Sequence, residues 1–105
     1  MLKKDFIINK QKDFERIFKQ GKFFKFEFFV LKTLKTDNNH PRIGISVGTK
    51  VDKRAVYRNK RKRQIKAIFK NHQNSSKSLD LWVLVRKGFN EDSLQELEAF
   101  FKKNL

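Results

Sequence analysis

The chain has 105 residues, no cysteine and a formal net charge of +15, with a sequence pI near 10.4. The missing cysteines exclude a disulfide framework and a thiolate metal site, and no apolar run approaches the roughly 20 residues of a membrane-spanning helix. With 38% hydrophobic residues, the sequence can build one modest core as a single domain over residues 1–105, so it is no disordered basic tail, and its charge predicts an anionic partner.

The first periodic segment is a short helix. Phe14, Ile17 and Phe18 follow a three–four spacing and predict one apolar helix face. Asn9 is suited to cap the start of this helix, and Gly21 is suited to end it.

From Phe23 to Thr36 the pattern changes to aromatic and β-branched residues, which predicts a strand; an interruption near Lys25 is compatible with it. Strict alternation would point Phe24, Phe26, Phe28 and Val30 one way, and Phe23, Phe29 and Leu31 the other. Residues 37–41, Asp-Asn-Asn-His-Pro, are of types that favour turns, so they predict a turn. Residues 42–48 then form a second predicted strand, with Ile43, Ile45 and Val47 on one face.

The most informative segment is a basic helix predicted over residues 53–72. Between Lys53 and Lys70 it carries nine Lys or Arg and no Asp or Glu. Its apolar stripe, Ile65, Ile68 and Phe69, lies in the second half, so that half should dock on the core. The face away from this stripe carries Asn59, Lys60, Arg63, Lys66 and Lys70.

The remaining chain predicts a polar loop over residues 74–78, a buried strand and a last helix. Leu79 to Val85 is apolar apart from Asp80, as in a central strand, and Trp82 within it is expected in the core. Residues 90–93 open the helix, whose buried stripe is Leu94, Leu97 and Phe101. The element order predicts an α+β fold, a single-domain α–β sandwich.

The basic helix predicts a nucleic-acid contact. Like charges three and four residues apart repel one another, and a polyanion relieves this repulsion. Asn59 among the cations can donate and accept hydrogen bonds, so it can reach a base edge, a ribose or a metal-bound water. One alternative is a basic face that is merely solvated, but nine cations with no acid to pair them favour a nucleic-acid contact. The other alternative is a helix on a membrane surface, which needs an apolar face along its whole length, and residues 58–64 lack one.

The aromatic residues suggest a second contact. A small domain cannot easily bury all 12 Phe side chains, so some should line a groove between the first helix and the sheet. Rings flanked by Lys10, Lys25 and Lys32 would form a stacking surface for single-stranded nucleic acid.

Signals for catalysis are weak. His40 lies in a turn, His72 ends the basic helix, and nothing in the sequence pairs them. No phosphate-binding glycine loop or metal-ligand spacing occurs. A stand-alone nuclease, which needs acid–base residues of its own, and a structural RNA-binding protein such as a ribosomal protein stay open as alternatives.

Residues 55–63 resemble the Ala-Val-x-Arg-Asn-Arg-x-Lys-Arg signature of the bacterial ribonuclease P protein component. Residues 42–47 resemble that family's strand before the signature helix, residues 12–21 its first helix and residues 80–87 its last strand. The resemblance follows the family's order over nearly the whole chain.

This resemblance implies a protein subunit that helps a catalytic RNA to remove the 5′ leader from precursor tRNA in the cytoplasm. The RNA would perform the hydrolysis with magnesium that it mainly holds itself, without an organic cofactor. The partners would be ribonuclease P RNA and precursor tRNA, with no membrane and one monomeric chain per RNA. The implied sandwich has a mixed sheet of about four strands, three helices and a left-handed βαβ crossover, the fold type of a small-subunit ribosomal protein domain.

The resemblance also implies site residues. The RNA-contacting set is Lys53, Arg54, Arg58, Asn59, Lys60, Arg61, Lys62, Arg63 and Lys66, with Asn59 also meeting RNA-bound magnesium. The set expected in a cleft for the leader is Lys10, Phe14, Phe18, Phe28, Val30 and Lys32.

Three positions depart from the family pattern. Lys60 stands where arginine is usual, which loses the planar fork for phosphate, and Thr49 stands where a basic residue is common. Lys32 takes a cleft position often filled by tyrosine; Phe28 would replace that ring, or Lys32 would meet a leader phosphate.

Overall fold

A computed structural model describes residues 3–75 and 77–105, which form one four-stranded sheet with helices on both faces. The elements in chain order are η1 (Lys4–Phe6), α1 (Gln11–Gln20), β1 (Lys22–Lys25), β2 (Phe29–Lys35), β3 (Arg42–Val47), α2 (Ala55–Lys70), β4 (Leu79–Val85) and α3 (Glu91–Asn104). Residue 76, inside the predicted polar loop, lies outside the described residues.

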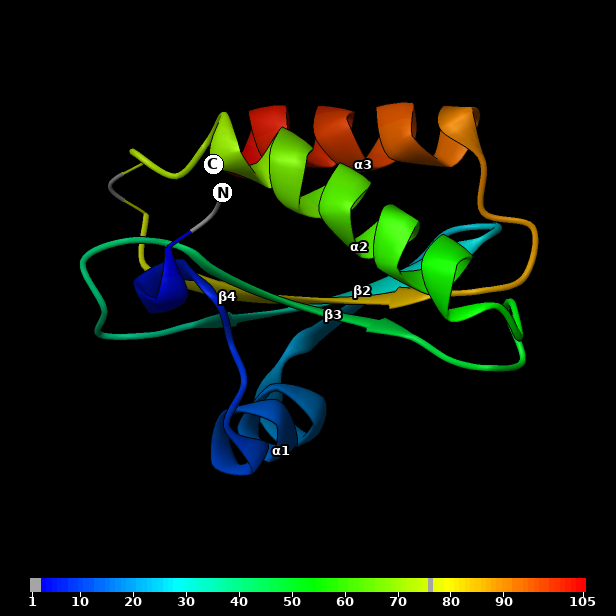
Figure 1. Ribbon diagram of the computed structural model, residues 1–105. Coiled ribbons are helices and arrows are strands. Elements are labelled where there is room, and N and C mark those ends of the chain that lie inside the picture. The colour runs from blue at the N-terminus through cyan, green and yellow to red at the C-terminus, as the bar shows by residue number, and fades with distance from the viewer. Residues whose placement is uncertain (1–2, 76) are drawn as a thin grey trace.

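The sheet is mixed, with the strand order β1-β2-β4-β3. Both β1 and β4 pair antiparallel with β2, whereas β3 and β4 are parallel neighbours joined by α2. Figure 1 shows α2 and α3 over one face and α1 on the other. There β3 runs left to right in front of β4, and α2 returns above them, so the crossover is left-handed. The predicted α+β sandwich is confirmed.

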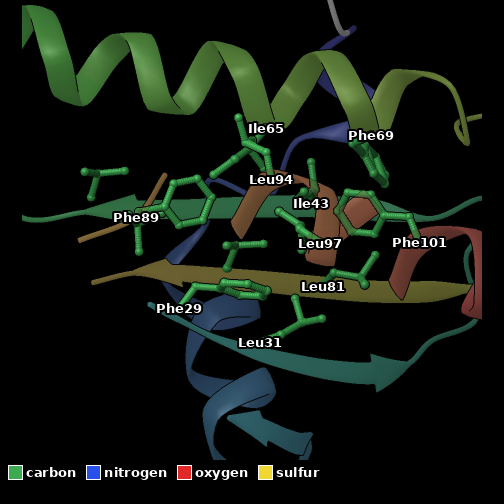
Figure 2. Close-up of a cluster of buried hydrophobic side chains, with 13 residues drawn as sticks. Phe29, Leu31, Ile43, Ile65, Phe69, Leu81, Phe89, Leu94, Leu97 and Phe101 are labelled. Carbon is green, nitrogen blue, oxygen red and sulfur yellow. The ribbon is translucent and has the colours of Figure 1, made fainter. Parts of the chain in front are cut away.

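The main core lies between the sheet and the α2/α3 layer (Figure 2). From α2, Ile65 and Phe69 are fully buried, and Phe101 of α3 packs edge-on against Phe69. The sheet contributes Phe29, Leu31, Ile43 and Leu81 to the same cluster. The predicted docking of α2 by its carboxyl half and the stripe of α3 are therefore confirmed.

The predicted strand segment from residue 23 to 36 is interrupted near Lys25, as the sequence allows, because β1 ends there. Its two parts do not form one strand, however, since the chain bends at residues 26–28 and forms a hairpin. The bend also overturns the predicted facing of the aromatic residues. Phe24 pairs with Leu31 and packs against the main core, whereas Phe23 pairs with Lys32 on the α1 face. No glycine or proline marks the bend, so the sequence pattern allows an interruption there but does not predict the reversal of the chain.

The ends of the helices differ slightly from the prediction. Lys10, not Asn9, occupies the capping position of α1, and no side chain caps it. Gly21 ends α1 as predicted, since its N–H donates to the carbonyl of Ile17. The basic helix begins at Ala55 instead of residue 53, so Lys53 and Arg54 lie in the preceding loop.

A large aromatic side chain packs closely against a glycine on the α1 face of the sheet. Trp82 of β4 lies beside Gly44 of β3, and its ring covers the glycine backbone. A Cβ atom at Gly44 would stand 2.2 Å from Cε3 of Trp82, far inside van der Waals contact. Glycine at this position thus allows a large ring to lie flat on the sheet.

Replacing Gly44 by alanine should therefore lower the free energy of unfolding by about 1–3 kcal/mol, because the added methyl group displaces the indole. Urea denaturation measures the change. The matched control is Gly48→Ala, where an added Cβ meets nothing within 4 Å. Trp82→Leu in the Gly44→Ala background should recover part of the loss; equal stability of the two alanine variants would contradict the contact.

Candidate nucleic-acid interface

The outer surface of α2 presents cations that the protein does not use internally. Among the residues that the structure describes, the side chains of Asn59, Lys60, Lys62, Arg63 and Lys66 form no hydrogen bond or ion pair with the protein. Asn59, Lys60 and Arg63 are exposed. Because α2 has no acidic residue in its first turn, nothing on the helix itself neutralises this surface.

Arg58 has a different role from these free cations. It is half-buried, and its Nη1 donates to the backbone carbonyls of Asp52 at 3.0 Å and Lys53 at 2.8 Å. These bonds tie the loop before α2 to the first turn of the helix. Arg58 thus holds the loop in place as well as carrying charge.

Arg54 and Arg61 also have partners within the chain. The guanidinium of Arg54 binds the Asp52 carboxylate and lies 3.7 Å from the ring centroid of Tyr57. Hydrogen bonds from the Arg54 side chain, and then from its backbone N–H, lower the pKa of Asp52. Arg61 donates to Gln64. The predicted RNA-contacting set thus divides into free cations and internally bonded arginines.

A second candidate surface lies on the opposite face of the sheet, under α1. Phe14 and Phe18 of α1 have ring centroids 4.2 Å apart. Trp82 meets Phe14 edge-on at 4.5 Å and Phe18 at 6.5 Å. These three rings form an aromatic cluster between α1 and the sheet, at the place where the sequence predicts a groove.

Trp82 is the residue that sequence reasoning placed incorrectly. It lies half-buried on the α1 face, outside the main core, and shares that face with Asp80 and Leu84. The apolar run from Leu79 to Val85 hides this alternation, because both faces of β4 are covered. Asp80, two residues before Trp82, was the available signal.

Lys32 lies in this cluster, and its amine already has partners within the protein. The Nζ donates to the carbonyl of Phe18 at 3.1 Å, at the carboxyl end of α1, where helix carbonyls lack partners. It also lies 4.2 Å from the ring centroid of Phe18. Lys32 therefore anchors α1 to β2.

Lys10 and Val30 border the cluster as the sequence predicts, but Phe28 does not. Lys10 and Phe14 line a cavity of about 220 Å³ together with Asn9, Gln11 and Trp82. Val30 lies opposite Leu84 and outside the main core cluster, two positions from Lys32 on β2. Phe28 precedes β2 and packs against Gly88 and the main core, so the structure does not bring it to the α1 face.

An ion-pair cluster positions α1 against the sheet. Arg42 of β3 binds buried Asp80 of β4 through Nε at 2.8 Å and Nη2 at 2.5 Å. Its Nη1 lies 3.6 Å from Asp13 of α1. The hydrogen bond to Asp80 raises the pKa of Arg42, so the guanidinium stays charged. One side chain thus links two strands and the helix.

Neither a metal centre nor a histidine pair appears in the described part of the chain. Residues 3–75 and 77–105 contain no group of three or more His, Cys, Asp or Glu that could hold a metal ion. His40 packs on Phe6, and His72 on Phe101, so each histidine is part of a separate aromatic contact. None of the described helices has the length and apolar character needed to cross a membrane.

Comparison with known proteins decides the family. The family profile for Ribonuclease P matches residues 2–105. The chain belongs to the ribonuclease P protein family. The ribonuclease P protein component of Streptococcus pneumoniae strain Hungary19A-6 is 39% identical over 98 residues, which cover 92% of this chain and 79% of the relative.

Solved structures of the ribonuclease P family share the fold. A Staphylococcus aureus RNase P protein mutant with defective mRNA degradation activity has a TM-score of 0.83 at 35% identity, covering 96% of this chain and 89% of that one. The Thermotoga maritima RNase P protein has a TM-score of 0.68 at 29% identity, covering 92% and 89%. The predicted family, the fold and the role of a ribonuclease P protein subunit are therefore confirmed.

Because Arg58 is bonded within the protein and Arg63 is free among the described residues, we expect different effects from replacing each of them by alanine. Arg63→Ala should weaken binding of ribonuclease P RNA and reduce the slope of log affinity against log salt by about one unit, with unchanged stability. Arg58→Ala should also lower the free energy of unfolding by about 1 kcal/mol, because the loop loses its hydrogen bonds. Filter binding at several salt concentrations and urea denaturation measure both effects. An unchanged slope for Arg63→Ala would remove that residue from the interface.

Proposed function

We propose that this ribonuclease P protein binds the catalytic RNA through the α2 surface and the 5′ leader of precursor tRNA through the cleft under α1. The RNA performs the phosphodiester hydrolysis, and the protein holds RNA and leader together in the cytoplasm, one chain per RNA. The protein contributes affinity and position, because its described residues bring no acid–base pair together.

The observation that carries this proposal is the aromatic cluster of Phe14, Phe18 and Trp82 on the face opposite the main core. Aromatic faces beside cations bind single-stranded bases with little sequence preference. A purely structural RNA-binding protein has no need for such a groove. The free cations of α2 alone would suit either role, so the cleft favours leader binding over the ribosomal alternative.

Magnesium in this proposal belongs to the RNA. The described residues offer no ligand cluster for a metal of their own, and the carboxylates of Asp13 and Asp80 are engaged by Arg42. Magnesium would supply charge neutralisation and an activated water in the RNA active site. The exposed amide of Asn59 is suited to an RNA group or to a water on an RNA-bound ion.

The direct test is cleavage of precursor tRNA by a bacterial ribonuclease P RNA at low magnesium, with and without this protein. We expect 5′ maturation with both components and none with the protein alone. The His40→Ala/His72→Ala variant serves as the control and should cleave as well as the unsubstituted protein with RNA. Binding of the RNA without any gain in cleavage would favour the structural alternative.

A second test addresses the cleft. Phe14→Leu keeps apolar volume in the cleft but removes one ring, so it should lower the affinity of the assembled enzyme for leader-bearing precursor by roughly 1–3 kcal/mol. Its affinity for mature tRNA should not change. Phe100→Leu, which removes a ring that packs on Phe24 and the main core, is the control. Equal losses for precursor and mature tRNA would show that Phe14 only supports the fold.

A further inference from the structure

Phe23 is a large aromatic side chain that the fold leaves outside both hydrophobic layers. It is 57% exposed, although it lies in a strand, and β1 is the edge of the sheet. Of the 12 Phe residues, it is the one that stands among the exposed large hydrophobic side chains of the described chain. Exposure of this ring to water is unfavourable, and an exposed ring next to a binding groove suggests contact with a ligand.

The strand register places Phe23 in line with the aromatic cluster. Phe23 lies opposite Lys32, and Lys32 lies opposite Trp82. Residues directly opposite one another share a face of the sheet, so these three form one row across β1, β2 and β4 on the α1 face. Trp82 continues over Gly44 of β3. The row therefore crosses the whole sheet, beginning at its β1 edge.

Lys32 joins the two parts of this row. Its Nζ lies 4.2 Å from the ring centroid of Phe18 and 5.8 Å from that of Phe23. Because the same amine donates to the Phe18 carbonyl, Lys32 fixes a positive charge beside both rings. Lys25, two residues after Phe23 on the same strand face, is exposed and adds a second cation.

We propose that Phe23 is an additional stacking position, which binds one base of the single-stranded 5′ leader at the β1 edge of the cleft, while Lys25 meets the adjoining phosphate. This inference rests on the proposed leader cleft and extends it beyond Phe14, Phe18 and Val30. A strand of RNA that follows the row meets rings alternating with cations, which suits bases and phosphates in turn. Lys32 stands where the family often has a tyrosine, and Phe23, its neighbour on the adjacent strand, provides an aromatic ring in its place.

The test uses the assembled enzyme, with ribonuclease P RNA, and measures its affinity for precursor tRNA and for mature tRNA. Phe23→Leu should weaken precursor binding roughly five- to tenfold and leave mature tRNA unaffected, since one base loses its platform. Phe23→Trp should retain wild-type affinity. The matched control is Phe24→Leu, the same change on the other face of the same strand, and it should leave leader binding unchanged.

Precursors with a single abasic leader nucleotide locate the contact. At one leader position, removing the base should weaken binding to the unsubstituted protein but not further weaken binding to Phe23→Leu. Wild-type affinity of Phe23→Leu for every precursor, or equal losses for precursor and mature tRNA, would overturn the inference. If the unsubstituted enzyme itself does not prefer precursor over mature tRNA, the leader cleft as a whole fails, and the two failures are thereby distinguished.

Discussion

The contact between Arg42 and Asp80 is the constraint on which the α1 face depends. Asp80 is 2% exposed, so its charge is stable there only with a bonded cation, and loss of such a partner typically costs about 3–5 kcal/mol. The pair joins the two parallel strands that the left-handed crossover brings together. Arg42 also reaches Asp13, so the helix that carries Phe14 and Phe18 is positioned by the same guanidinium.

The two faces of the sheet differ in chemistry. The face under α2 and α3 is closed by apolar side chains such as Phe69 and Phe101, and it supplies the main core. The other face has one short helix, a charged cluster at one end and the rings of Phe14, Phe18 and Trp82 beside it. Within the described chain, the buried indole N–H of Trp82 has no hydrogen-bond partner, a cost that proteins tolerate at binding sites. The main core and the proposed leader cleft thus lie on opposite faces of the sheet.

The sequence predicted most elements because their apolar periodicity is strong. The stripes of α2 and α3 and the inward residues of β3 lie where the spacing places them. The interruption near Lys25 agrees with the sequence pattern, but the hairpin does not follow from it, because residues 26–28 carry no glycine or proline and Phe28 packs against the distant Gly88. The φ of Gly88 is 99°, which allows the turn between β4 and α3 against which Phe28 packs. Trp82 was misplaced because a strand covered on both faces loses its alternation. The left-handed crossover came only from the family resemblance, and no local pattern encodes it.

Side chains of α2 also divide between those that stabilise the fold and those that remain free for a ligand. A helix with seven cations and no acid is unfavourable by its own repulsion, yet α2 forms because Ile65 and Phe69 anchor its second half in the core. Arg58 offsets part of the cost by binding two carbonyls of the preceding loop. Lys60 and Arg63 obtain no such relief inside the described chain. A polyanion bound at this surface would relieve the repulsion between these charges, so α2 is suited to the RNA contact that we propose for it.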